Sequence, residues 1–156
     1  MTPYRGDAGG TITMVTLIGG LVGGLVATIV MTAFMMSLGD DSPPPTALFW
    51  SKYVGDGDPG EYMIQGMALH LLYGVIAGGV FAAVAPAVGF VSVATVGAAV
   101  LWGLLYGFVL FLGAAAFWMN VVLGLSPEPK DVAMFLLFHL VYGAVLGGWV
   151  GYGILG

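Results

Sequence analysis

The sequence predicts an all-α integral membrane protein with four transmembrane helices, arranged as two pseudo-symmetric helical hairpins with glycine-rich packing faces. Hydrophobic residues make up 60% of the 156 residues and charged residues 7%, with a mean hydropathy of +1.04. A soluble domain carries about 25% charged residues. Residues 8–39, 62–127 and 132–156 contain no Asp, Glu, Lys or Arg, and each run exceeds the roughly 20 residues that cross a bilayer. Residues 1–156 therefore form a single membrane domain.

The first transmembrane helix is expected over residues 11–38. The segment "GDDSPPPT" (39–46) ends it, because proline removes a backbone donor and favours an extended residue before it. The amphipathic, aromatic segment 47–55 follows. We expect it to lie at the membrane surface, with Trp50 and Tyr53 at the level of the lipid headgroups.

The second and third helices are expected over residues 61–85 and 91–114, on either side of a turn at Pro86 and Gly89. One helix over 88–125 would extend roughly 57 Å, against a hydrocarbon core of about 30 Å. Residues 115–125, with Trp118 and Asn120, are therefore predicted to form a bent or interfacial segment. The fourth helix is expected over 131–154.

Two stretches of the sequence nearly repeat each other: "HLLYGVIAGGV" (70–80) and "HLVYGAVLGGW" (139–149), identical at six of eleven positions. They contain both histidines of the chain. With four helices, the second and fourth run in the same direction, so His70 and His139 are expected at nearly equal depth. Parallel repeats of this kind are related by an axis along the membrane normal. The first and third helices show a weaker match, Gly19, Gly23 and Ala27 against Ala99, Gly103 and Gly107.

Small residues recur every four positions after each histidine, at Gly74 and Gly78 and again at Gly143 and Gly147. In lipid, such spacing marks faces on which two helices approach closely. The pattern predicts a tightly packed bundle.

The two histidines allow two interpretations, because an ionisable side chain at membrane depth is costly and often functional. Each neutral imidazole could hydrogen-bond a neighbouring helix, through a carbonyl or through Thr28, Thr32, Tyr73 or Tyr142. Alternatively, His70 and His139 could be paired axial ligands of a b-type haem, with Gly74 and Gly143 leaving room for the macrocycle. The sequence has no basic cluster for the haem propionates.

Copper is a further alternative ligand. Met63, Met67 and His70 share one helical face at i, i+4 and i+7, and thioethers are soft ligands suited to Cu(I). Met31, Met35 and Met36 add three more thioethers on the first helix. Methionine also fills gaps in ordinary cores, so a packing role is the competing interpretation.

Composition excludes several classes of function. The chain has no cysteine, which rules out disulfides and thiolate metal sites. Its net charge of −5 and pI near 4.4 argue against nucleic acid, which requires a basic surface. The sequence shows no phosphate-binding loop, nucleophile–base pair, three-ligand metal site or intramembrane carboxylate. We therefore predict that the protein is not an enzyme and name no catalytic residue.

The stretches "GLVGGLVATIVMT" (20–32), "HLLYGVIAGGV", "GLLYGFV" (103–109) and "HLVYGAVLGGW" resemble an uncharacterised family, a domain of unknown function. Its members are small four-helix membrane proteins of haloarchaea and bacteria with paired His-x-x-Tyr-Gly helices. The resemblance covers nearly the whole chain. It implies four helices, His70 and His139 as signature positions, and a cytoplasmic N-terminus, and it implies no activity.

The first functional prediction is an accessory or structural subunit of a larger membrane complex, such as a respiratory oxidase. It rests on the small extramembrane mass and on small-residue faces in excess of what four helices need. The alternatives are a haem- or copper-binding module using His70 and His139, and a small oligomeric transporter or channel. We expect a multi-pass protein of the cell membrane, in contact with the bilayer and with other subunits or further copies of itself. Both termini should lie on one side; one Lys or Arg on that side against two on the other does not orient the chain.

Overall fold

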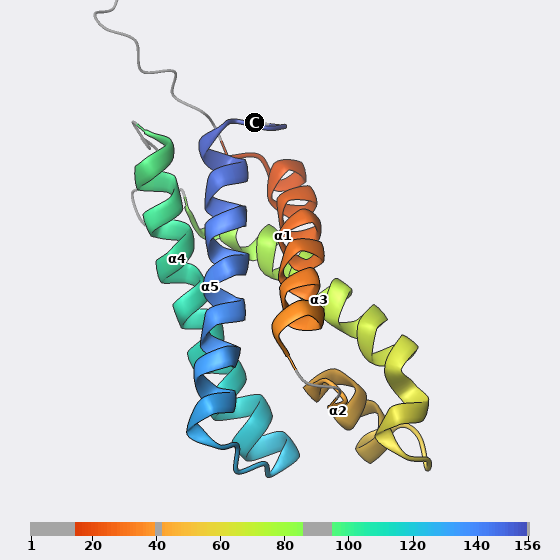
Figure 1. The fold of residues 1–156 in the computed structure, drawn as a ribbon. Coiled ribbons are helices and arrows are strands. Elements are labelled where there is room, and N and C mark those ends of the chain that lie inside the picture. Colours follow the sequence, from red (N-terminus) through yellow and green to blue (C-terminus); the bar gives the residue numbers. More distant parts are fainter. Residues whose placement is uncertain (1–14, 40–41, 86–94, 156) are drawn as a thin grey trace, which may run out of the picture.

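The structure is a computed structural model, and it describes residues 15–39, 42–85 and 95–155. Within these ranges all regular structure is helical. The elements are α1 (Leu17–Leu38), α2 (Pro45–Tyr53), η1 (Pro59–Tyr62), α3 (Met63–Val84), α4 (Val96–Gly113), η4 (Ala114–Leu123) and α5 (Pro129–Gly151) (Figure 1). Four helical segments are long and apolar enough to cross a membrane: Leu17–Leu38, Pro59–Val84, Val96–Leu123 and Pro129–Gly151. The chain is an all-α membrane protein.

The first helix begins at Leu17, later than the expected residue 11, because Thr16 is its N-cap. The Thr16 side chain accepts a hydrogen bond from the Gly19 N–H at 2.9 Å, which satisfies a donor that the helix itself leaves unpaired. Residues 11–14, the turn at Pro86 and Gly89, and the expected start of the third helix at Val91 lie outside the described residues. The described part of that helix starts at Val96, after the cap residue Thr95.

The last helix begins at Pro129, two residues before the expected start, and ends at Gly151. Glu128 and Asp131 form a capping box, in which each side chain accepts a hydrogen bond from the backbone of the other residue. The acidic residue predicted to open the helix therefore occupies its third position. Proline at the first position fits, because that residue has no intrahelical donor role.

Residues 115–125 were expected to form a bent or interfacial segment, and most of them are π-helical. Helix α4 continues without a break into the π-helix η4, which ends at Gly124 in the left-handed conformation, with φ of 69°. Helices with i→i+5 hydrogen bonds are rare in proteins, and those that occur often lie at functional sites. No apolar pattern in the sequence distinguishes a π-helix from an α-helix, so this element was not predicted.

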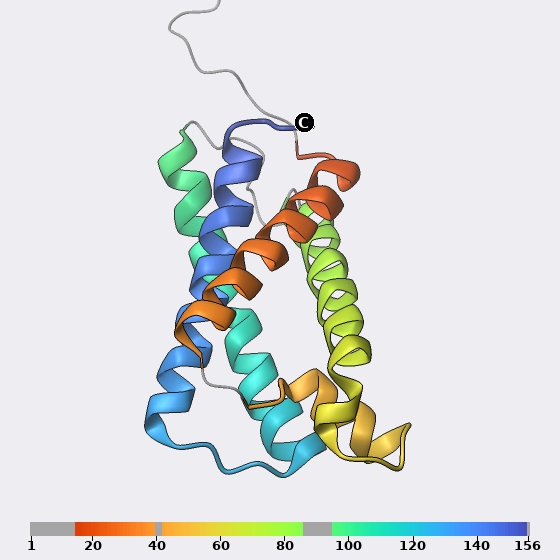
Figure 2. The same ribbon diagram turned by 45° about the vertical axis from the view of Figure 1, so that its right-hand side comes forward.

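The spanning helices pair as α1 with α3 and α4 with α5, and α1 also packs on α5 (Figures 1 and 2). The start of α1 and the end of α5 lie at the same end of the bundle, where the Thr16 hydroxyl donates to the Leu155 carbonyl. Helix α2, η1 and the start of α5 lie at the opposite end (Figure 2). This end is called the α2 end below.

Glycines lie where the paired helices approach most closely. A Cβ on Gly24 would lie 2.5 Å from the Gly74 oxygen, and one on Gly103 would lie 2.1 Å from the Gly143 oxygen. Gly24 thus corresponds to Gly103, one residue away from the match expected from the sequence. Gly23 instead faces α5, where a Cβ would lie 2.7 Å from the Trp149 ring. Helix α1 therefore uses adjacent glycines for two different neighbours.

Candidate functional site

The two histidines line one cavity of about 260 Å³, which we call the inner cavity. It lies among all the spanning helices and is closed by residues 44–46 and α2. Its walls are largely carbon; the oxygen and nitrogen atoms on the lining side chains belong to Thr28, Thr46, His70, Tyr73, Trp118, His139 and Tyr142. The predicted candidate residues Tyr73, Gly74 and Tyr142 also line it. The histidine and the tyrosine of both copies of the repeat therefore line one cavity.

His139 is 6% exposed and is held by its own helix. Its Nδ1 lies 2.8 Å from the Phe135 oxygen, and only a protonated Nδ1 can donate there. The rings of Phe135 and Phe111 stand edge-on to the imidazole, with centroid distances of 4.4 and 6.2 Å. These contacts fix the ring and leave Nε2 as the nitrogen with a free lone pair.

His70 has a different environment, although it begins the same phrase. Its Nε2 is buried and has no hydrogen-bond partner within the described ranges. The sequence offered Thr28, Thr32, Tyr73 and Tyr142 as partners for the imidazoles. Thr28 instead donates to the Gly24 carbonyl at 2.7 Å, and Tyr142 donates to the Gly74 carbonyl at 2.7 Å.

The predicted space for a macrocycle beside Gly74 and Gly143 is filled. A Cβ on Gly74 would lie 1.7 Å from the Thr28 hydroxyl oxygen, and one on Gly143 would lie 2.1 Å from the Gly103 oxygen. These glycines admit neighbouring helices. The two glycines therefore give no support to a haem between His70 and His139, which stays a prediction.

A second cavity, the outer cavity, adjoins the first toward the α2 end and measures about 450 Å³. The two cavities have six lining residues in common, which we call the neck. These are Met35, Pro44, Pro45, His70, Met119 and Phe135. The predicted copper residues Met63 and Met67 line the outer cavity together with His70.

The π-helix η4 forms one wall of the inner cavity through Ala114, Trp118, Met119 and Leu123. Its C-terminal end is held by α2. Lys52 Nζ donates to the Val122 and Leu123 carbonyls at 3.0 and 3.1 Å, where the partial negative charge of a helix end favours a cation.

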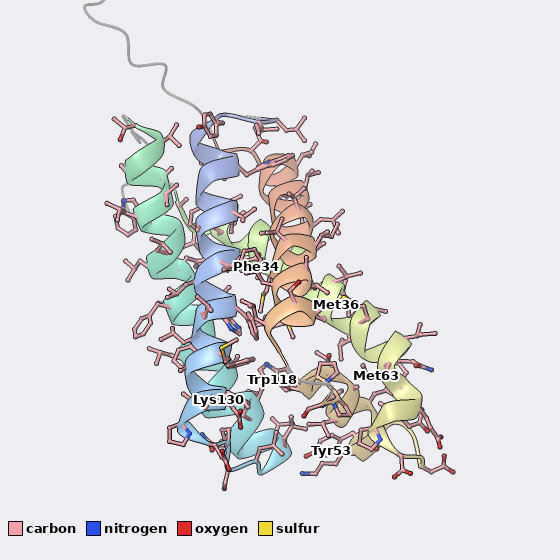
Figure 3. All side chains as sticks on the ribbon, viewed as in Figure 1. Phe34, Met36, Tyr53, Met63, Trp118 and Lys130 are labelled. Carbon is pink, nitrogen blue, oxygen red and sulfur yellow. The ribbon has the colours of Figure 1, made fainter. Side chains whose placement is uncertain are left out.

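Aromatic contacts add to this attachment of α2. Tyr53 donates to the Val122 carbonyl at 2.5 Å, and Phe49 packs edge-on against Trp118 at 5.4 Å. Figure 3 shows Tyr53 and Trp118 toward the α2 end. The segment expected to lie free on the membrane surface therefore closes the site.

Among the described residues, no group of three or more His, Asp or Glu side chains could hold a metal ion. In comparisons with protein-family models, with curated proteins and with solved structures, nothing similar to this chain was found. The resemblance to the uncharacterised four-helix family stays a prediction. The site must be interpreted from its own chemistry.

Sequence reasoning missed several lining residues, above all Met119, Trp118 and Phe135. Phe135 could have been found, because it lies one turn before His139. Met119 and Trp118 could not be placed, because their direction depends on the π-helical register.

Proposed function

We propose that this protein is a non-enzymatic membrane protein that binds a small ligand in the inner cavity, with His70 and His139 as the recognition groups. The observation that supports this is the convergence of the chain's two histidines on one apolar cavity. Ionisable residues at membrane depth are rare and usually mark functional sites.

A purely structural role for the histidines has little support from their hydrogen bonds. Side chains that join membrane helices bond across the interface. His139 bonds to Phe135 on its own helix, and His70 Nε2 lacks a partner among the residues described. Tyr142 provides the link between helices that the histidines do not.

The size of the cavity restricts the ligand. Its volume of about 260 Å³ is below the roughly 300–1,000 Å³ typical of pockets for drug-sized molecules. A metal ion or a ligand of few atoms fits these walls better than a macrocycle.

Ligand retention tests the proposal. The wild type, His70→Ala and His139→Ala should be purified in mild detergent from cells grown with added haem and transition metals, then measured by native mass spectrometry, absorption and metal analysis. We expect a bound species in the wild type that both variants lose. Gln65→Ala is the matched control, since Gln65 lies on α3 and lines neither cavity. A wild type free of any bound species, or equal retention in all variants, would contradict the proposal.

The accessory-subunit role is the second candidate function, and the surface of α4 favours it. This helix exposes a row of large apolar side chains, at Leu101, Leu105, Phe108, Val109 and Leu112. The glycine faces no longer support it, because Gly24, Gly103 and Gly143 are used within the chain. Native purification should recover a partner subunit at fixed stoichiometry; a lone monodisperse protein would argue against the role.

Transport or channel activity is the remaining sequence-based proposal, and the adjoining cavities are the path it would use. It predicts a solute or ion flux in proteoliposomes that requires the protein. Equal fluxes in vesicles with and without the protein would exclude transport or channel activity.

A further inference from the structure

The methionines of this protein gather around the two cavities. All seven methionines in the described ranges line one cavity or both: Met31, Met35, Met36, Met63, Met67, Met119 and Met134. Other large apolar residues cover the outside as well; Leu101 is 67% exposed and Val121 73%. Met36 and Met63 are themselves 80% and 41% exposed, so the methionines most relevant to a ligand are Met35 and Met119, which line both cavities.

The neck contains three side chains with ligand atoms, each from a different helix. Met35 comes from α1, His70 from α3 and Met119 from η4. The remaining neck residues, Pro44, Pro45 and Phe135, offer only carbon from their side chains. Met119 is 8% exposed, and His70 Nε2 is one of two buried side-chain nitrogens without a hydrogen-bond partner among the described residues, the other being Trp149 Nε1.

Two thioethers and one imidazole make a soft, uncharged set of donors. Such donors select Cu(I), whereas carboxylate and carbonyl oxygens suit Mg²⁺ and Ca²⁺. Structural zinc sites use four ligands drawn from thiolate, imidazole and carboxylate, and the neck holds only one of these groups. We propose that the neck is a Cu(I) site with His70 Nε2 and the sulfur atoms of Met35 and Met119 as ligands. This inference rests on the proposed function, because it names the ligand that His70 holds at the mouth of the same site; His139 lines the inner cavity only and is not a direct ligand.

The outer cavity provides an approach for the ion. Four further methionines line it, at Met36, Met63, Met67 and Met134, and both Asp131 and Lys130 lie at its wall. Figure 3 shows Met36 on α1 and Met63 on α3, at the ends of these helices nearest α2. The described residues of the α2 end include Asp56, Asp58, Glu61, Glu128 and Asp131 against Lys52 and Lys130. This excess of acidic residues raises the local concentration of a cation at that end.

Gap filling is the competing explanation for the methionines, since this flexible side chain fits irregular spaces. The two explanations differ in what sulfur does. Replacing methionine by leucine keeps volume and apolar character, and usually has a small effect on packing. It removes the metal ligand completely.

The test is an anaerobic titration of the detergent-purified full chain with Cu(I), in competition with a chromophoric Cu(I) chelator. We expect one tightly held Cu(I) per chain. Met35→Leu and Met119→Leu should each weaken binding by about tenfold or more, since even second-shell changes cost 10–100-fold at metal sites. Gln65→Ala, on α3 and lining neither cavity, is the control and should leave the affinity unchanged. X-ray absorption of the loaded protein should show both sulfur and nitrogen neighbours.

Thermal unfolding of the metal-free variants checks that each one still folds. Binding that survives in Met35→Leu and Met119→Leu would overturn the neck site, as would absence of Cu(I) uptake by the wild type. If the wild type ignores Cu(I) but retains another species that His70→Ala and His139→Ala lose, the copper inference fails and the proposed function stands. If it retains nothing, both fail.

Discussion

The two histidines show how one sequence phrase can have two environments. His139 lies on α5, which packs on both α1 and α4, and its ring is fixed between Phe111 and Phe135. His70 lies on α3, whose main spanning neighbour is α1, and its Nε2 has no hydrogen-bond partner in the ranges described. The helix at the centre of the bundle holds its histidine through Nδ1, whereas the helix at the edge leaves the buried Nε2 of its histidine without a partner in that part of the chain.

The tyrosines of the same phrase lead to a stability prediction. Tyr142 is 3% exposed and donates to the Gly74 carbonyl across the α5–α3 interface, whereas Tyr73 is 37% exposed. Tyr142→Phe should lower the free energy of unfolding by about 0.6–1 kcal/mol, the usual size of such bonds between membrane helices. Tyr73→Phe, its counterpart in the repeat, should change it by less than half as much. Denaturation with SDS in mixed micelles measures both; equal effects would show that the hydroxyl bond contributes nothing.

At the level of elements, the glycine contacts between α4 and α5 lead to the largest expected effect. A Cβ on Gly143 would meet the Gly103 oxygen at 2.1 Å and its carbonyl carbon at 2.8 Å. Backbone atoms cannot rotate away, so the helices must separate. Gly143→Ala should destabilise the fold by about 1–3 kcal/mol, as overpacking does.

Gly113→Ala is the control for this prediction. No atom of the described residues lies within 4 Å of a Cβ built there, and alanine favours helix over glycine by about 1 kcal/mol. The variant should be neutral or slightly more stable by the same SDS assay. A loss similar to that of Gly143→Ala would mean that close helix approach is not the cause.

The attachment of α2 to the π-helix predicts a local change in dynamics. Lys52→Leu keeps the aliphatic stem and removes the two hydrogen bonds to the Val122 and Leu123 carbonyls. Hydrogen exchange should become several-fold faster at the end of η4, because helix ends open locally when their caps are lost. Lys130→Leu, at an exposed position in the first turn of α5, should leave this exchange unchanged. An unchanged rate in Lys52→Leu would show that α2 does not hold η4.

The helices were predictable from the sequence, and the neck between the two cavities was not. Runs without charge and proline-rich breaks determine the number and order of spans, because lipid tolerates little else. The repeat predicted His70 and His139 at nearly equal depth, and the structure shows that both line the inner cavity. Met119 joins them only because residues 114–123 wind as a π-helix, which depends on tertiary packing. The hydrogen-bond partners of the two imidazoles were also not predictable, because they depend on which helix lies at the centre of the bundle.

For the whole molecule, the arrangement divides the membrane protein into two unequal ends. The α2 end carries the surface helix, η1, the acidic loops and the outer cavity, whereas the opposite end joins Thr16 to Leu155. The outer cavity therefore lies at one end of the bundle, the end that α2 covers. The architecture can be tested by determining which helix ends lie on the same side of the membrane.

Cysteine labelling can make that test because the chain has no native cysteine. Single variants Asp56→Cys and Ser126→Cys lie in exposed loops at the α2 end, and Tyr152→Cys, at a residue 73% exposed, lies beyond α5 at the other end. In sealed vesicles of uniform orientation, a membrane-impermeant maleimide should label Asp56→Cys and Ser126→Cys together, and Tyr152→Cys only in the opposite vesicle orientation. Four spans require this pattern, since each crossing reverses the side. Labelling of Ser126→Cys together with Tyr152→Cys would mean that α5 does not span, and that His139 is not held at membrane depth opposite His70.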